Sequence, residues 1–213
     1  MINILVHGLG QTDRSWDKVK ENLNQDNINV ETPNLFEIAK NYQLTYENVF
    51  AVFVDYCNSF NDKLNLIGIS MGGLLAIDYA ILYPEKINSI ILCGVPYEIP
   101  KKLFKIQNFI FRFMPKMTFE KMGISKENFI QLTNSMAELN IKEKVSKIKC
   151  STLVICGEND KVNLESAKQL NKVIKNSKLK IIEKAGHEVN VDTPKELANE
   201  IYDFLKNNNK DRK

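Results

Sequence analysis

The segment from Leu64 to Ala80 reads LNLIGISMGGLLAIDYA and joins an unbroken apolar run to a stretch with helical periodicity. A short apolar run without alternation is typical of a β-strand that is buried on both faces. Ser70 stands at the junction, with Gly68 two residues before it and Gly72 two residues after it. Glycine lacks a Cβ atom, so this spacing permits a sharp turn from strand to helix that presents the serine hydroxyl. The pattern therefore predicts a presented nucleophile rather than an ordinary polar turn.

Strand-like and helix-like segments alternate along most of the chain. The expected strands lie at 2–6, 28–32, 63–69, 87–94, 151–157 and 178–185, and the expected helices at 14–26, 43–61, 71–83, 163–175 and 194–208. Thr193 and Pro194 form a favourable N-cap and first residue for the last helix. Continuous apolar strands that alternate with helices indicate a mostly parallel sheet with helices on both faces. The sequence predicts one α/β domain over residues 1–213, with about six strands.

The segment 96–147 interrupts this alternation, because it has no strand signal. Five of the 11 phenylalanines lie in it, at Phe104, Phe109, Phe111, Phe113 and Phe119, and a second helical pattern follows around 126–140. We expect a helical insertion that covers the sheet as a cap or lid.

An apolar stripe at helical spacing runs through this insertion. Its members are Leu103, Ile106, Ile110, Phe113 and Met114. The stripe is expected to face the sheet, which makes Phe109 and Phe113 candidates for an apolar substrate pocket. In the alternative interpretation, the stripe only attaches the insertion to the core.

The composition argues against several classes of partner. The chain has 213 residues, 44% of them hydrophobic, and a formal charge of +3 without a long basic tract, so binding to nucleic acid is not expected. No apolar run approaches about 18 residues and no leader pattern precedes the first strand, so neither stable membrane insertion nor export is expected. Cysteines 57, 93, 150 and 156 have no paired short spacing and are expected as buried thiols. These features favour a cytoplasmic protein.

The pentapeptide GISMG around Ser70 resembles the Gly-x-Ser-x-Gly nucleophile elbow of the α/β-hydrolase fold family. VHGLG at 6–10 is similar to the oxyanion loop of that family, CGENDKV at 156–162 to its acid turn, and AGHEVNVDTPKELANEIYDFL at 185–205 to its histidine loop and last helix. The resemblance implies a minimal version of the fold, which starts at the oxyanion-loop strand and lacks the usual N-terminal strand pair. One departure is Asn163, which stands where the family often has a proline shortly after the acid turn.

The chemistry of a serine nucleophile requires a base and an acid. A serine hydroxyl is weakly nucleophilic, and an imidazole with a pKa of about 6.5 is a suitable base. The chain has two histidines; His7 belongs to the oxyanion loop and is expected to form structural hydrogen bonds, which leaves His187 as the candidate base. Asp160 follows an expected strand and is the candidate acid that orients the imidazole, with Glu158 and Asp192 as weaker alternatives. The order Ser70, Asp160, His187 is also the chain order of the family.

The resemblance implies a serine hydrolase that cleaves a small carboxylic ester through an acyl-enzyme. It also implies an oxyanion hole formed by the backbone N–H groups of Leu9 and Met71, and a reaction that requires neither a metal nor an organic cofactor. An apolar acyl group is expected from the insertion. Thioester and C–C bond hydrolases share this constellation, so a thioesterase or a carrier-protein ester hydrolase is an alternative. An acidic carrier would then bind the lysines of 101–126. A non-catalytic ligand-binding homologue is the remaining alternative.

Overall fold

The computed structural model describes residues 1–99, 111, 113–120 and 122–210. Six strands in this part of the chain form one parallel sheet in the order β2-β1-β3-β4-β5-β6. The strands are β1 (Ile2–Val6), β2 (Val30–Glu31), β3 (Leu64–Ile69), β4 (Ile87–Cys93), β5 (Ser151–Gly157) and β6 (Ser177–Ile182). The predicted α/β fold with a parallel sheet is confirmed.

The helices also follow the predicted pattern. They are η1 (Asp13–Trp16), α1 (Asp17–Gln25), α2 (Leu35–Ile38), α3 (Tyr46–Asn58), α4 (Met71–Leu82), α6 (Lys116–Glu120), α7 (Lys126–Met136), η2 (Val145–Lys147), α8 (Leu164–Val173), α9 (Val189–Asp192) and α10 (Pro194–Lys210). Helices α2 and α9 were not expected, because four residues are too few to show a helical period. No described helix has both the length and the apolarity to cross a bilayer.

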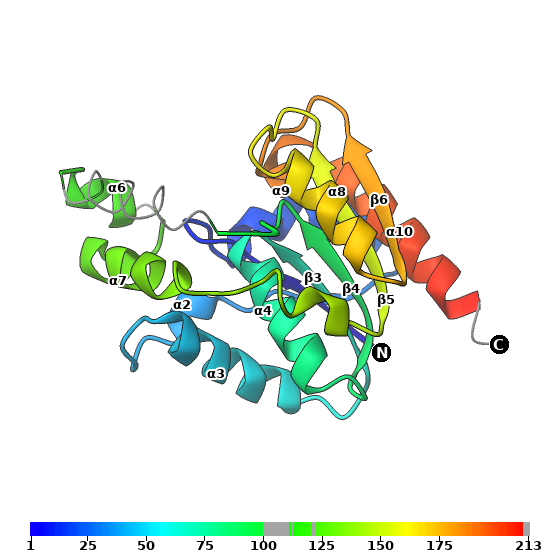
Figure 1. Ribbon diagram of the computed structural model, residues 1–213, viewed down its shortest axis with the longest axis horizontal. Coiled ribbons are helices and arrows are strands. Elements are labelled where there is room, and N and C mark those ends of the chain that lie inside the picture. Colours follow the sequence, from blue (N-terminus) through cyan, green and yellow to red (C-terminus); the bar gives the residue numbers. More distant parts are fainter. Residues whose placement is uncertain (100–110, 112, 121, 211–213) are drawn as a thin grey trace.

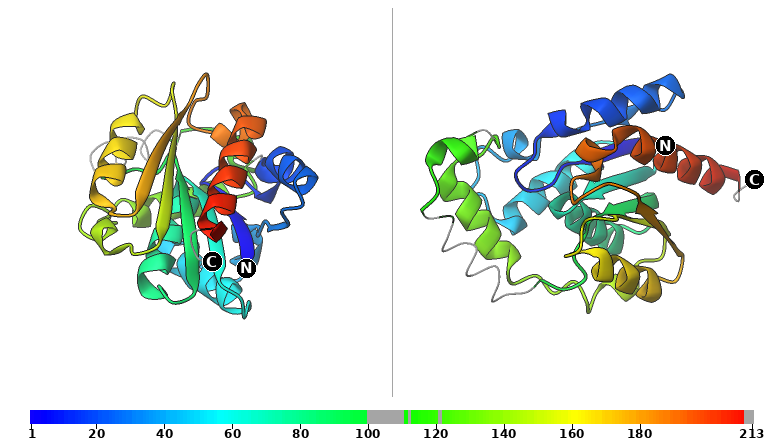
Figure 2. Two further views of the ribbon diagram at one scale, coloured as in Figure 1. Left: turned by 90° about the vertical axis from the view of Figure 1, so that its right-hand side faces the viewer. Right: turned by 90° about the horizontal axis from the view of Figure 1, so that it is seen from above.

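Helices cover both faces of the sheet (Figure 2). On one face, α1 and α10 enclose a core that includes Trp16, Ile67 and Ile201. On the other face, α3, α4 and α8 enclose a second core that includes Leu66 and Phe53. Successive residues of one strand point to opposite faces, so Leu66 and Ile67 enter different cores. This double burial explains why the sequence of β3 has no polar alternation.

The start of α4 packs on the sheet through backbone atoms. A Cβ atom at Gly72 would lie 2.2 Å from the carbonyl oxygen of Val6 in β1. A Cβ atom at Gly68 in β3 would lie 2.3 Å from the carbonyl oxygen of Gly72. Both distances are far below van der Waals contact. The helix therefore approaches two neighbouring strands more closely than any side chain allows.

A buried polar chain crosses the other end of the sheet, near the amino ends of the strands. Asn88 Nδ2 and Ser89 Oγ each donate to Asn65 Oδ1 at 2.7 Å. Asn65 Nδ2 donates to Asn3 Oδ1 at 2.8 Å. These groups come from β1, β3 and β4, and their mutual hydrogen bonds offset the cost of burying them.

The segment between β4 and β5 contains helices and, among its described residues, no strand. Figure 1 shows α6 and α7 projecting beyond the sheet. Leu132 of α7 is nevertheless fully buried in the core formed by α3 and α4. Ser135 Oγ accepts from the N–H of Tyr46 at 2.8 Å, and Lys144 forms an ion pair with Asp78 of α4. The second half of the insertion is thus attached to the main core.

Three phenylalanines form an aromatic cluster within the insertion. The ring centroids of Phe111, Phe119 and Phe129 lie 5.1 to 6.1 Å apart. Phe113 is 75% exposed, so the prediction that its ring faces the sheet is wrong. Phe111, two residues earlier, takes the inner position because its ring completes the cluster. Phe109 and the earlier part of the predicted stripe lie outside the described residues.

Replacement of Gly72 by alanine tests the backbone contact between α4 and β1. In an uncrowded helix this substitution would raise stability by about 0.5–1 kcal/mol, because alanine is the better helix former. Here the added methyl group overlaps Val6, so we expect Gly72→Ala to lower the free energy of unfolding by about 2 kcal/mol or more. Urea unfolding of both proteins measures the difference. A more stable variant would contradict the close contact.

Candidate active site

The sheet has a topological switch point between β1 and β3. From β1 the chain continues to β2 on one side and later returns to β3 on the other side. In open parallel sheets, ligands bind in the crevice at the carboxyl ends of the strands beside such a point. The loop after β1 and the turn after β3 meet there, since a Cβ atom at Gly8 would lie 3.4 Å from Ser70 Cβ. The predicted oxyanion loop and the predicted nucleophile are therefore neighbours.

Ser70 occupies the tight turn that its flanking glycines predicted. Its backbone has φ 51° and ψ −115°, a conformation that residues other than glycine rarely adopt. Its N–H donates to the carbonyl of Cys93 at 2.9 Å, and its own carbonyl accepts from Gly73 and Leu74 at 3.0 and 3.1 Å. These three bonds stabilise the strained turn at the start of α4. Strain of this kind is typical of functional sites.

Asp160 and His187 form a hydrogen-bonded pair at the same edge of the sheet. His187 Nδ1 lies 2.7 Å from Asp160 Oδ2. The Asp160 side chain is 4% exposed and that of His187 is 43% exposed, so a buried carboxylate supports a more accessible ring. Gly94 leaves room for the pair, since a Cβ atom there would lie 3.0 Å from His187 Nδ1. The structure thus brings the predicted acid and the predicted base together.

The electrostatics of the pair favour an ionised acid. Burial raises the pKa of the Asp160 carboxyl, but the hydrogen bonds from His187 and Asn163 lower it by more, so this pKa lies below its ordinary value. The hydrogen bond to Asp160 raises the pKa of His187, and burial only partly opposes this effect. A carboxylate that accepts from Nδ1 leaves Nε2 of the neutral ring as a proton acceptor.

Asn163 contributes to this pair in a way that the sequence analysis missed. Its Nδ2 atom lies 3.1 and 2.9 Å from the two carboxylate oxygens of Asp160, and its backbone N–H lies 3.3 Å from Oδ1. A proline at this position could supply neither an N–H group nor an amide side chain. The departure from the family pattern therefore adds donors to the acid. An amide three residues after an aspartate, just before a helix, is the sequence signal.

The two alternative acids are engaged elsewhere. Glu158 Oε2 accepts from the N–H of Lys184 at 3.1 Å, and Asp192 Oδ2 accepts from the N–H of Gly186 at 2.7 Å. Both carboxylates thus hold the backbone of the loop that carries His187. Among the three candidates, Asp160 is the one that bonds the imidazole.

His7 is a structural histidine, as predicted. It is fully buried, its Nδ1–H donates to the carbonyl of Gly8 at 2.9 Å, and its Nε2 accepts from the N–H of Leu35 at 3.0 Å. Burial lowers the pKa of His7 and outweighs its hydrogen bond to Gly8. The neutral ring joins the loop after β1 to the start of α2.

The N–H groups of Leu9 and Met71 are the predicted donors of the oxyanion hole. Within the described part of the chain, neither group has a hydrogen-bond partner. Met71 is the first residue of α4, where N–H groups lack partners inside the helix. Gly8 differs, because its N–H lies 3.4 Å from the Gln11 side-chain oxygen. Both N–H groups thus meet one requirement of an oxyanion hole, which needs donors without other partners.

Ser70 Oγ forms no hydrogen bond with His187 among the described residues, and such bonds often tighten only when substrate binds. The same part of the chain contains no cluster of three or more candidate metal ligands. The arrangement is suited to proton transfer and nucleophilic attack.

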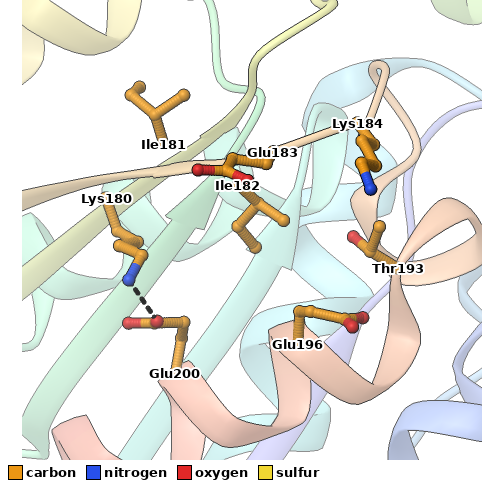
Figure 3. A pocket seen from close by; sticks show the side chains of 8 residues that line it. All are labelled: Lys180, Ile181, Ile182, Glu183, Lys184, Thr193, Glu196 and Glu200. Atoms are coloured by element: carbon orange, nitrogen blue, oxygen red, sulfur yellow. Dashed lines mark ion pairs between the residues drawn. The ribbon is translucent and has the colours of Figure 1, made fainter.

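A pocket between β6 and α10 lies apart from these residues (Figure 3). Lys180 and Glu200 form an ion pair across it at 2.6 Å. Lys184 and Thr193 line it as well, on either side of the loop that carries His187. None of the predicted site residues lines this pocket, so it is distinct from the candidate active site.

Comparison with known proteins agrees with this geometry. Residues 4–133 match the family described as the alpha/beta hydrolase fold. The chain belongs to this hydrolase family. It is 27% identical over 180 residues to a Bacillus subtilis protein named as a 2-succinyl-6-hydroxy-2,4-cyclohexadiene-1-carboxylate synthase, with 67% of this chain and 66% of that protein covered. It is 26% identical over 191 residues to the Mus musculus monoacylglycerol lipase ABHD6, with 70% of this chain and 57% of that protein covered.

The solved structure of a thermophilic esterase from Thermogutta terrifontis has the same fold. The TM-score is 0.80 at 22% sequence identity, and the match covers 98% of this chain and 90% of the esterase. The chain spans about two thirds of the length of the first curated relative and 57% of the second. The comparisons thus agree with the family that the sequence resembles.

The Asp160–His187 hydrogen bond makes a prediction about proton binding. The pKa of His187 is raised above the ordinary value of 6.5 in the folded protein. The pair therefore contributes stability that is fully present below pH 6.5 and is lost as the pH rises through the pKa of the folded state. We expect Asp160→Asn to lower the pKa of His187 and to remove this pH-dependent stability. NMR titration resolves the two histidines, and His7 serves as the internal control. An unchanged His187 pKa would contradict the pairing.

Proposed function

We propose that this hydrolase is a serine esterase that cleaves a carboxylic ester of a small molecule through an acyl-enzyme. One observation carries the proposal: Ser70 lies on a strained turn at the sheet edge that also bears the 2.7 Å pair of Asp160 and His187. A nucleophile, a base and an orienting acid from three separate strand ends are the components that acyl transfer requires. The family and the esterase-like fold support the same class of reaction.

In the proposed reaction, His187 Nε2 takes the proton of Ser70 Oγ as the oxygen attacks the ester carbonyl. The carbonyl oxygen becomes an oxyanion and accepts from the N–H groups of Leu9 and Met71. The tetrahedral intermediate then collapses, His187 returns the proton to the leaving alcohol, and an acyl-serine remains. A water molecule deprotonated by His187 attacks this ester, and the bond to Ser70 Oγ breaks as His187 returns the proton to that oxygen, which releases the acid. Throughout, the Asp160 carboxylate holds Nδ1–H and stabilises the imidazolium.

The insertion supports an apolar acyl group. A Cβ atom added at Gly10 would lie 3.5 Å from Met122 Sδ of the insertion. Likewise, a Cβ atom added at Gly123 of the insertion would lie 2.9 Å from Thr12 Cγ2. The insertion thus contacts the oxyanion loop directly. Leu9 and Met122 are partly buried apolar residues on the two sides of this contact. A hydrocarbon chain beside them would gain burial, whereas the hydroxyl groups of a sugar would lose hydrogen bonds. Phe109 stays in the proposal as a pocket residue.

Thioesters are the second substrate class that we consider. The acyl-enzyme chemistry is identical, and an acidic carrier protein is a proposed partner for the lysines of 101–126. Lys116, one of the described residues there, forms an ion pair with Glu127 at 3.2 Å on the surface. This pairing favours an ordinary solvated face. We therefore prefer a free small-molecule ester as the proposed substrate. The proposed compartment of the protein is a reducing cytoplasm.

Fluorophosphonate labelling tests the nucleophile. We expect mass mapping to locate the label on Ser70, and Ser70→Ala to abolish both labelling and turnover of p-nitrophenyl acetate. His187→Ala should lower kcat by about 10³-fold or more, and Asp160→Asn should be severe because it favours the wrong tautomer. Labelling at another serine would exclude the proposed nucleophile. Near-normal turnover by Asp160→Asn, with loss in Asp192→Asn or Glu158→Gln, would exclude the proposed acid.

A series of p-nitrophenyl esters tests the apolar acyl group. We expect kcat/KM to rise from acetyl to medium chains by up to about tenfold for each pair of methylenes, at about 0.8 kcal/mol per buried methylene, until the pocket is full. Met122→Ala should flatten this rise, and Phe113→Ala shows whether the exposed ring contributes. Phe129→Ala is the control, because its ring belongs to the aromatic cluster and should affect stability alone. A flat profile in the wild type would exclude the apolar pocket and leave the esterase assignment intact.

A further inference from the structure

The Gln11 side chain joins the oxyanion loop to the loop that carries His187. It is 7% exposed, and its Nε2 atom donates to Glu188 Oε1 at 2.7 Å and to Asn190 Oδ1 at 3.3 Å. Asn190, which is 1% exposed, returns a bond from its Nδ2 atom to Gln11 Oε1 at 3.3 Å. The two buried amides therefore pair reciprocally across 179 residues of sequence.

The same side chain holds its own loop. Gln11 Oε1 accepts from the N–H of Gly8 at 3.4 Å and from Ser15 Oγ at 3.3 Å. The N–H of Gln11 donates to the carbonyl of Gly8 at 3.3 Å. Asn190 Nδ2 also donates to the carbonyl of Ser15 at 3.2 Å. One amide thus closes the turn after β1 and connects it to the other loop.

This network leaves no hydrogen-bonding group of the Gln11 amide unused. Both N–H bonds have acceptors, and the oxygen accepts from the Gly8 N–H and from Asn190 Nδ2. The single proton of Ser15 Oγ is shared between this oxygen at 3.3 Å and the nearer Thr12 carbonyl at 2.7 Å. A buried polar network that is fully satisfied favours a single arrangement, because any displacement leaves a buried group unpaired. The network is therefore suited to fixing the geometry of two loops.

The ends of the network adjoin the proposed reacting groups. Gly8 directly precedes Leu9, a proposed oxyanion donor, and Glu188 directly follows His187, the proposed base. A tetrahedral intermediate must contact both groups at once, so their separation affects its stability. The two loops follow β1 and β6, which β3, β4 and β5 separate in the sheet, and no other described side chain forms hydrogen bonds to both of them.

We propose that Gln11 is a positioning residue that sets the separation between the oxyanion loop and the base, acting through Asn190 and Glu188. The proposal rests on the esterase function proposed above. It assigns Gln11 no contact with the reacting atoms. A purely structural role would make the same bonds contribute only to the stability of the fold.

The main experiment compares isosteric variants that lack the bonds. Gln11→Met and Asn190→Leu each keep the approximate volume of the side chain. We expect each to lower kcat for p-nitrophenyl acetate by about tenfold or more, with a small change in KM, and the double variant to resemble the single ones because the pair acts as a unit. The rate of fluorophosphonate labelling should fall in parallel. Asn65→Leu is the matched control, since it removes an equally buried amide near the amino ends of the strands.

Glu188 offers a second comparison with little risk of unfolding, because it is exposed. Glu188→Gln and Glu188→Ala both remove the charge beside His187, but only the glutamine can still accept from Gln11. We expect Glu188→Gln to retain several-fold more activity than Glu188→Ala. Equal activity of these two variants would contradict the proposal. Normal kcat in folded Gln11→Met, with only a lower Tm, would also contradict it.

A readout without turnover separates this proposal from the esterase assignment. Because His187 Nδ1 lies 2.7 Å from Asp160 Oδ2, we expect the proton between them to give a low-field NMR signal that depends on the position of the imidazole. We expect Gln11→Met to shift or broaden this signal and Asn65→Leu to leave it unchanged. A wild-type protein that neither reacts with fluorophosphonate nor hydrolyses esters would overturn the esterase assignment. The NMR comparison would still decide the role of Gln11 in that case. An unchanged signal in Gln11→Met would overturn the positioning role.

Discussion

Backbone contact between the start of α4 and strands β1 and β3 is the constraint on which the rest of the site depends. Gly68 and Gly72 permit it, because a Cβ atom at either position would overlap main-chain oxygens. The contact forces Ser70 into a positive φ and leaves the first N–H groups of α4 without partners inside the helix. It also brings the loop after β1 beside the serine. A single packing requirement therefore underlies the position of the proposed nucleophile and of both proposed oxyanion donors.

Polar side chains, rather than further apolar packing, determine the geometry around this contact. Asn163 holds the two oxygens of Asp160, and Asp192 holds the backbone beside His187. Gln11 and Asn190 connect the loop of the base to the loop of the oxyanion donors. Loops at the end of a sheet have little apolar surface to bury, so directional hydrogen bonds are the means by which they adopt one conformation.

The insertion shows how far helical periodicity alone can mislead. The spacing placed Phe113 on the inner face, yet the ring is exposed and Phe111 packs with Phe119 and Phe129 instead. A prediction from the periodicity of one segment assumes a regular helix and does not say which other segment that helix packs against. The inner positions are decided by which rings on α6 and α7 can meet, and those belong to other segments. Leu132 of α7, unlike Phe113, is buried in the main core.

Local sequence determined most of the fold and the choice of Ser70 as the proposed nucleophile. Continuous apolar strands, helical periods and the glycines around Ser70 act within a few residues, so the parallel sheet, the turn and the choice between two histidines could be predicted. Only the tertiary structure decided that Asp160, rather than Glu158 or Asp192, bonds His187. It alone revealed Asn163 as a donor to that acid and the pairing of Gln11 with Asn190. These contacts join loops far apart in the chain, and their partners are fixed by how the strand ends meet in space.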